Sequence, residues 1–492
     1  MAGQSASLVD EEAAQAARSV PLTRRFKAAY GAGSMADGIV TAGFGFFLLF
    51  YLTAVCGMSG TMAGTAKMIA LLVDAFADPA IGLASDRIRS RFGRRLPFMV
   101  GGLVPFAAAF GMLFSMPALS GGAQFLYVTV CLIALRLSLS FFVLPFTAVG
   151  AEVTDDYRER ASIVSYRLSF QSAGILCGVV LGLGVFMSGA SGLLERANYV
   201  PFAWSCAAVM MVTGLIAIGA VRRALPRLHG ARPDDSSFLA GFSRELVELA
   251  RNRSFLLLFG TVLIYFLAYT TWTSLALHAA RYFWKLDSFA IQWVVLSATF
   301  GPLLGAPISA IALRHIEKRT LSIGAFLAIA LLQMWPPLLQ LYGPAPLAPA
   351  TAAVMLFVNG LLVGTAIMVG GVGFQSMLAD TADEHEWLFG VRREGLFFSG
   401  LTLAYKASAA LGGLIAGVAL DAIRFPTDLA SKGPAVVIPG EVLAKLGLIA
   451  GPLPAAFAAL APLFLFGYHL TRKRHAQIIA DLEQRHAKNA GA

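Results

Sequence analysis

The sequence predicts an all-α membrane protein with twelve transmembrane helices. Hydrophobic residues make up 57% of the 492 residues and charged residues only 13%, an apolar share above that of ordinary soluble domains. Apolar windows of about 20 residues recur along the whole chain, and each is long enough to cross the roughly 30 Å hydrocarbon layer as a helix. The basic residues also alternate between successive loops, as expected for a multi-pass protein.

The predicted spans fall into two sets of six. The first set lies near residues 28–51, 62–85, 97–117, 123–149, 162–188 and 200–221, and the second near 254–279, 288–312, 321–341, 350–378, 396–421 and 447–470. Under this assignment 28 of the 38 basic residues lie on the side of the termini, 6 on the other side and 4 within spans. The positive-inside rule therefore predicts that both termini are cytoplasmic. The net charge of +10 follows these loops, so no nucleic-acid partner is expected.

The longest polar stretch separates the two sets of spans and contains a turn-prone DDSS sequence. We therefore expect a domain order typical of transporters with two six-helix halves. Its predicted parts are a cytoplasmic N-terminal segment at 1–27, an N-terminal half at 28–221, a cytoplasmic linker at 222–253, a C-terminal half at 254–470 and a cytoplasmic tail at 471–492.

Seven charged residues fall inside the predicted spans. They are Asp37, Lys67, Asp74, Asp78, Arg136, Arg167 and Lys406. An ionised side chain in the middle of a bilayer costs at least about 2.5 to 3.5 kcal/mol, so each needs a partner or a water-filled cavity. These residues are the candidate working parts of the protein.

Asp74 and Asp78 are four residues apart, which places both carboxylates on one face of a helix. Two such charges repel by about 3 kcal/mol at an effective dielectric constant near 20, and a bound proton or a metal cation relieves this repulsion. The spacing therefore predicts a cation site, which would hold sodium if the ion is not a proton. The alternative is a static ion network with Lys67 or Lys406.

Three residues of the fourth span share one face, because Arg136 precedes Ser140 by four residues and Val143 by seven. Arg136 could face a cavity and bind an anionic or polyhydroxylated substrate, or it could pair with Asp37. Arg167 lies about two turns into the fifth span, where it could line the same cavity or extend to the membrane interface.

Opposite charges also meet in the predicted cytoplasmic loops. We expect them to form gate ion pairs, although the positive-inside rule alone explains much of the basic charge. The candidate gate residues are Asp86, Arg87, Asp380, Asp383, Arg392 and Arg393, the last four in a predicted loop after the tenth span. No HExxH, GxSxG or phosphate-binding GxxxxGK[ST] motif occurs, so the protein is predicted to be neither an enzyme nor ATP-driven, and to need no cofactor.

Four stretches of the chain resemble the glycoside-pentoside-hexuronide:cation symporters, the melibiose-permease branch of the major facilitator superfamily. These stretches are YGAGSMADG, VDAFADPAIGLASDRIRSRFGRRLPF, PFTAVGAEVTDDYRERASIVSYR and MLADTADEHEWLFGVRREGLFF, in family order. The resemblance implies the major facilitator fold. It also implies that Asp74, Asp78 and Ser140 form the cation site with Lys406 nearby, and that Asp37 and Arg167 serve the substrate site. Lys406 is a candidate for both sites.

The sequence departs from melibiose-type proteins at two positions. Val143 stands where they carry a second sugar-binding aspartate, and Arg136 stands where they have a small residue. A galactoside substrate is therefore not expected. The related sodium-dependent lysophospholipid transporters keep a lipid-like substrate open as an alternative.

The sequence predicts a secondary active transporter that couples sodium or proton entry to uptake of a sugar or glycoside by alternating access. One charge crossing 100 mV releases about 2.3 kcal/mol, enough for roughly 40- to 50-fold accumulation. We expect a monomeric multi-pass protein of the cell's inner (cytoplasmic) membrane, with the small-molecule substrate and the lipid bilayer as partners. A membrane enzyme or receptor is the alternative from another class.

Overall fold

The computed structural model describes residues 20–88, 90, 92–189, 191–228, 249–390, 394–432 and 437–490, without the side chains of 86, 87, 394–396, 398, 399 and 488–490. Within these ranges the chain is helical and contains no strand. Twelve helices of the described part are long and apolar enough to cross a membrane, which confirms the predicted number. The orientation of the termini stays a prediction.

The twelve spans match the predicted ones in order. They are Arg24–Val55, Gly60–Ser85, Leu96–Phe114, Gly121–Glu152, Tyr157–Phe186, Arg196–Arg223, Arg253–Phe283, Ser288–His315, Lys318–Tyr342, Pro349–Phe389, Gly400–Ala422 and Gly440–Leu465. Contacts divide the chain into two compact units, Met1–Ser236 with Pro426–Val436 and Ser237–Phe425 with Val437–Ala492.

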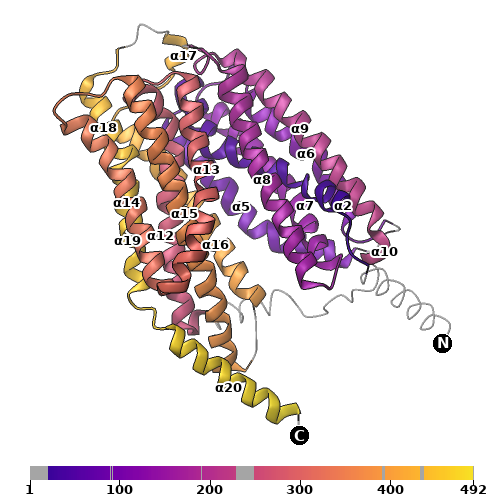
Figure 1. Ribbon diagram of the computed structural model, residues 1–492. Coiled ribbons are helices and arrows are strands. Elements are labelled where there is room, and N and C mark those ends of the chain that lie inside the picture. Colours follow the sequence, from indigo (N-terminus) through magenta and orange to yellow (C-terminus); the bar gives the residue numbers. More distant parts are fainter. Residues whose placement is uncertain are drawn as a thin grey trace. The chain divides into compact units, whose positions relative to one another are not determined.

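The first unit runs from indigo to magenta in Figure 1, except for the segment with α17, which is drawn in golden orange. Its helices are α2 (Arg24–Gly31), α3 (Ser34–Ala42), α4 (Leu48–Phe50), α5 (Gly60–Arg87), α6 (Leu96–Phe114), α7 (Gly121–Glu152), α8 (Tyr157–Val179), α9 (Arg196–Arg223), α10 (Leu225–Leu228) and α17 (Leu429–Lys432), with π-helical stretches at Gly43–Phe47, Tyr51–Val55 and Val180–Phe186. α7 packs against both α5 and α6, and α3 packs along α8. The short segment with α17 belongs here by its contacts with the stretch Tyr51–Val55, which include a 3.1 Å hydrogen bond from Asp428 N to the Thr53 carbonyl.

Stacked aromatic rings form part of the core of the first unit. The Tyr30 and Phe146 ring centroids lie 4.5 Å apart, and those of Phe146 and Phe142 lie 5.7 Å apart. The Tyr30 hydroxyl also donates a hydrogen bond to the Phe146 carbonyl. The start of the first span is therefore attached to the C-terminal part of α7, on the same helix as Arg136 and Ser140.

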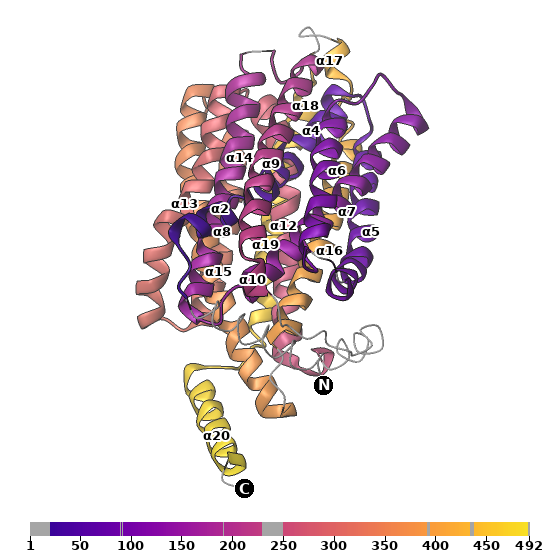
Figure 2. The same ribbon diagram turned by 90° about the vertical axis from the view of Figure 1, so that its right-hand side faces the viewer.

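The second unit is drawn from pink to yellow in Figures 1 and 2. It contains α12 (Arg253–His278), a π-helical stretch at Ala279–Phe283, α13 (Ser288–His315), α14 (Lys318–Tyr342), α15 (Pro349–Phe389), α16 (Glu394–Ala422), α18 (Gly440–Ala450), α19 (Pro452–Leu465) and α20 (Arg472–Ala490). α15 packs against α13 and α14, while α12 packs against α16 and α19. The C-terminal helix α20 contacts α15, whose last turns extend toward it in Figure 2.

The structure corrects two sequence predictions in the second unit. Residues 379–389 form the end of α15 and are not a loop, because this stretch has no Gly or Pro and the helix ends only at Gly390, whose φ of 76° closes it in the left-handed conformation. The last span begins at Gly440 and not near 447, and it is interrupted at Gly451 before Pro452. Both differences concern helix ends, where hydropathy alone is a weak guide.

Two glycines allow α3 and α8 to cross with their backbones in contact. A Cβ at Gly38 would lie 2.1 Å from the Gln171 carbonyl oxygen, and a Cβ at Gly174 would lie 2.3 Å from the Met35 carbonyl oxygen. No side chain larger than hydrogen fits at either position in this arrangement. The crossing places the residue before Gly38, Asp37, beside Gln171.

Candidate substrate and ion site

Four helices of the first unit carry the charged side chains predicted within its spans. Asp37 lies on α3, Asp74 and Asp78 on α5, Arg136 on α7 and Arg167 on α8. Since α5 packs on α7, α7 contacts α8 and α8 packs on α3, these helices form one connected group.

Arg136 forms an ion pair with Asp74. The Arg136 Nη2 atom lies 2.5 Å from Asp74 Oδ2, and the Ser140 hydroxyl donates a hydrogen bond to the other carboxylate oxygen, Oδ1, at 2.9 Å. The Asp74 side chain has no solvent exposure, and that of Arg136 is 16% exposed. Arg136 and Ser140 reach the same carboxylate because they are one helical turn apart on α7. The sequence left Asp37 open as the partner of Arg136, and the structure shows that the ion pair is made with Asp74.

Two further charged residues of α5 lie on either side of Asp74 along the helix. Asp78 follows Asp74 by one helical turn and is half-buried. Lys67 is buried, and its ammonium group donates a hydrogen bond to the Phe44 carbonyl at 3.5 Å. The positive charges of Lys67 and Arg136 act on each other, so a second cation lies within electrostatic range of the pair.

Asp37 is held by the side-chain amide of Gln171, a contact that was not predicted from the sequence. The Gln171 Nε2 atom donates to Asp37 Oδ2 at 2.6 Å, and Arg136 and Arg167 both act electrostatically on this carboxylate. The neutral amide was missed because an uncharged side chain has no large cost inside an apolar span and therefore gives a weak signal in the sequence. Its position one turn after Arg167 on the same face of α8 could have indicated it.

Arg167 is attached to α7. Its Nη2 atom donates a hydrogen bond to the Thr147 hydroxyl at 2.9 Å, and its guanidinium lies 5.1 Å from the centroid of the Phe146 ring. Val143 packs against the apolar core that contains Phe146. Arg167 is therefore a positioned side chain and not a freely extended one.

Lys406 belongs to the second unit, on α16, and is half-buried. Its predicted approach to Asp74 and Asp78 stays a prediction.

A second charged cluster lies where α5, α6 and α7 meet near their ends. The Glu152 carboxylate accepts hydrogen bonds from Arg94 Nη2 and Arg95 Nη2, both at 2.9 Å, and Arg95 Nη1 donates to the Ser85 hydroxyl at 2.7 Å. The side chains of the predicted gate residues Asp86 and Arg87 lie outside the described residues. Glu152 therefore joins the end of α7 to the start of α6 and, through Arg95, to α5.

We expect Glu152→Gln to reduce the free energy of unfolding by about 1.5 to 3 kcal/mol, since hydrogen bonds to charged groups contribute roughly that much. The amide oxygen can still accept hydrogen bonds but no longer balances two guanidinium charges. Chemical unfolding in detergent micelles, followed by tryptophan fluorescence, measures the loss. Glu195→Gln is the matched control, because its carboxylate accepts hydrogen bonds from Ser191 and Asn198, which lie close to it in the chain. Equal stability of the two variants would contradict the joining role of Glu152.

The candidate gate residues on α15 also have partners within the second unit. Both oxygens of Asp380 accept hydrogen bonds from Lys318 Nζ, at 2.9 and 2.7 Å, and Asp383 Oδ2 lies 2.9 Å from His475 Nε2 of α20. Arg392 and Arg393 lie outside the described residues. Lys318 and His475 were not predicted as partners from the sequence, because both are distant in sequence from Asp380 and Asp383.

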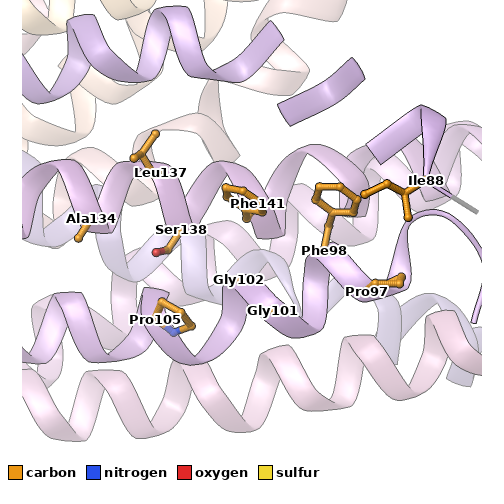
Figure 3. Close-up of a pocket in the computed structure, with 10 residues that line it drawn as sticks. All are labelled: Ile88, Pro97, Phe98, Gly101, Gly102, Pro105, Ala134, Leu137, Ser138 and Phe141. Atoms are coloured by element: carbon orange, nitrogen blue, oxygen red, sulfur yellow. The ribbon is translucent and has the colours of Figure 1, made fainter. Parts of the chain in front are cut away.

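A separate pocket of about 510 Å³ lies between α6 and α7 and is entirely different in character (Figure 3). Its lining includes Ile88, Phe98, Pro105, Leu137 and Phe141, and Ser138 is the one hydroxyl-bearing residue among the ten that line it. The helices approach closely there because Gly102 has no side chain. A Cβ at this position would lie only 3.0 Å from the Ser138 carbonyl oxygen. None of these ten lining residues is charged, and the polar cluster of Asp37, Asp74, Arg136 and Arg167 is the better candidate site.

The chain is similar in sequence and in fold to known transport proteins. Residues 29–472 match the model of a family described as MFS/sugar transport protein. The chain is 27% identical to an uncharacterised symporter of Synechocystis, covering 94% of this chain and 97% of the relative. It is 26% identical to a putative glycoside/cation symporter of Escherichia coli, covering 96% and 97% of the two chains. The crystal structure of a D-xylose-proton symporter shares the fold, with a TM-score of 0.60 at 13% identity over 91% of this chain and 98% of that one.

Proposed function

Because this chain belongs to the MFS/sugar transport protein family, we propose that it couples the entry of a cation, sodium or proton, to the uptake of a sugar or glycoside by alternating access. The family resemblance predicted from the sequence is confirmed, and so is the multi-pass membrane location, which in a bacterium means the inner membrane. The family and the named relatives are transporters, in agreement with the prediction that the chain is not an enzyme.

The observation that carries the proposal is the set of opposite charges on α3, α5, α7 and α8 within the apolar spans. Asp37 and Gln171 offer oxygen and amide groups that suit sugar hydroxyls. The Nε atoms of Arg136 and Arg167 are buried and make no hydrogen bond to the described residues, so each has a donor to offer. This arrangement supports a polyhydroxylated substrate. The lysophospholipid alternative is not favoured, since a relative whose name states a substrate class is called a glycoside symporter.

In this proposal Asp74, Asp78 and Ser140 on facing helices form the coupling site, and Lys406 approaches it from α16. Asp37, Arg136 and Arg167 contact the substrate. Val143 offers the substrate an apolar contact where melibiose-type proteins have an aspartate. Charged pairs open and close the cytoplasmic side. The gate residues are Asp86, Arg87, Asp380, Asp383, Arg392 and Arg393. We propose that the protein works as a monomer.

Uptake by proteoliposomes tests the proposal. A panel of labelled glycosides and pentosides is offered under an imposed proton or sodium gradient, and we expect roughly 40- to 50-fold accumulation of the substrate at 100 mV. Asp78→Asn should retain exchange of substrate across the membrane but lose gradient-driven accumulation. Unchanged accumulation in Asp78→Asn would contradict the coupling site, and accumulation of lysophospholipid without competition by sugars would contradict the substrate class.

A further inference from the structure

Resting on the proposed function, we infer that the Arg136 guanidinium takes the place of a sodium ion at Asp74, so that the transport cycle does not use sodium. Of the two coupling ions that the proposed function allows, this leaves the proton. Arg136 thereby becomes the residue that determines ion specificity.

Both oxygens of the Asp74 carboxylate already have partners. A sodium ion is bound by several oxygen ligands at once. One Asp74 oxygen is in contact with Arg136 Nη2 at 2.5 Å, and the other accepts the Ser140 hydrogen bond at 2.9 Å. Both oxygens therefore have a partner within the protein, and the side chain has no solvent exposure.

Electrostatic repulsion also opposes a sodium ion at Asp74. A buried carboxylate requires a compensating positive charge, and the guanidinium supplies it through a charge-assisted hydrogen bond. A metal cation that used the same carboxylate would lie beside a fixed positive charge, with the charge of Lys67 also acting on Arg136. Arginine stays protonated at all physiological pH values, so the repulsion cannot be relieved by loss of a proton.

The oxygen donors expected for sodium are the Asp74 and Asp78 carboxylates and the Ser140 hydroxyl. The Ser140 hydroxyl already donates its hydrogen bond to Asp74 Oδ1, and the Arg136 guanidinium is the cation beside Asp74 Oδ2. These residues do not fit a sodium site while Arg136 is present.

The test is sodium-dependent thermal stability of the purified protein, which needs no substrate. Melting temperatures are measured in sodium chloride and in choline chloride at equal ionic strength for the wild type, Arg136→Gln, Arg136→Lys and the double variant Arg136→Gln with Asp74→Asn. We expect no sodium-specific shift for the wild type and Arg136→Lys. Arg136→Gln should gain a shift of about 2 to 4 °C, because a carboxylate released from its guanidinium can bind the ion and ion binding is linked to stability. The double variant should lose this shift.

The wild-type measurement decides the inference even if Arg136→Gln does not fold. A sodium-specific stabilisation of the wild type that Asp74→Asn removes would overturn it. In proteoliposomes, a sodium gradient without a proton gradient should drive no accumulation by the wild type, and accumulation under that gradient would equally overturn it. Absence of accumulation under either gradient contradicts the proposed symport instead, while the melting experiment still reports on sodium binding.

Discussion

Arg136→Met should lower the free energy of unfolding by about 3 to 5 kcal/mol, since removal of one partner of a buried ion pair leaves the other charge poorly compensated. Asp74 has no solvent exposure, and the substitution removes the guanidinium that lies 2.5 Å from its Oδ2 atom. Methionine approximates the length of the arginine stem, so the loss measures the charge and not the packing. Equilibrium unfolding in detergent micelles gives the value.

Two further variants identify the cause of this loss. Arg136→Met combined with Asp74→Leu should recover most of the stability, because replacement of a whole buried ion pair by apolar residues is often neutral or stabilising. Arg167→Met is the matched control, since its described hydrogen bond goes to the neutral Thr147 hydroxyl and not to a buried carboxylate. If Arg136→Met and Arg167→Met were equally stable, the Arg136 and Asp74 pair would not be a stabilising contact.

Gly38→Ala should destabilise the protein by about 3 kcal/mol, the upper part of the range for an overpacked core. The new methyl group would lie 2.1 Å from the Gln171 carbonyl oxygen and 2.9 Å from the Ile175 amide nitrogen, which are backbone atoms that cannot rotate away. The helices α3 and α8 would have to separate. Thermal melting in detergent should show the loss.

Separation of α3 and α8 should also impair transport by the protein that remains folded. Asp37 precedes Gly38, so its 2.6 Å hydrogen bond with Gln171 should lengthen and substrate KM should rise in the fraction of protein that remains folded. Gly45→Ala, in the same span, is the matched control, because a Cβ added there would meet no neighbouring helix of the described chain within 4 Å. A melting temperature of Gly38→Ala equal to that of Gly45→Ala would contradict the close crossing.

Most of the architecture was predictable from the sequence for a simple reason. The length of an apolar run and the cost of a charge inside it are local properties of the chain. All twelve spans were therefore predicted, and the charged residues within them were recognised as candidates. The errors lie at helix ends, as at α15, where the chain leaves the apolar layer and hydropathy no longer distinguishes a helix from a loop.

The choice of partners within the candidate site was not predictable in the same way. Spacing places Arg136 and Ser140 on one face of α7, but it cannot tell whether that face meets Asp37 or Asp74. Gln171 was missed because a neutral amide gives no signal of cost inside an apolar span. Its contact with Asp37 depends on two glycines, at 38 and 174, that allow distant helices to touch.

By itself, the sequence determined that this chain crosses a membrane twelve times and which charged groups it carries into the apolar layer. Only the tertiary structure decided that the Asp74 carboxylate is neutralised by Arg136. These two residues are 62 positions apart, on α5 and α7. Their pairing depends on how two helices rotate and pack against each other, and helix packing is determined by side chains from the whole unit and not by the local pattern around either residue.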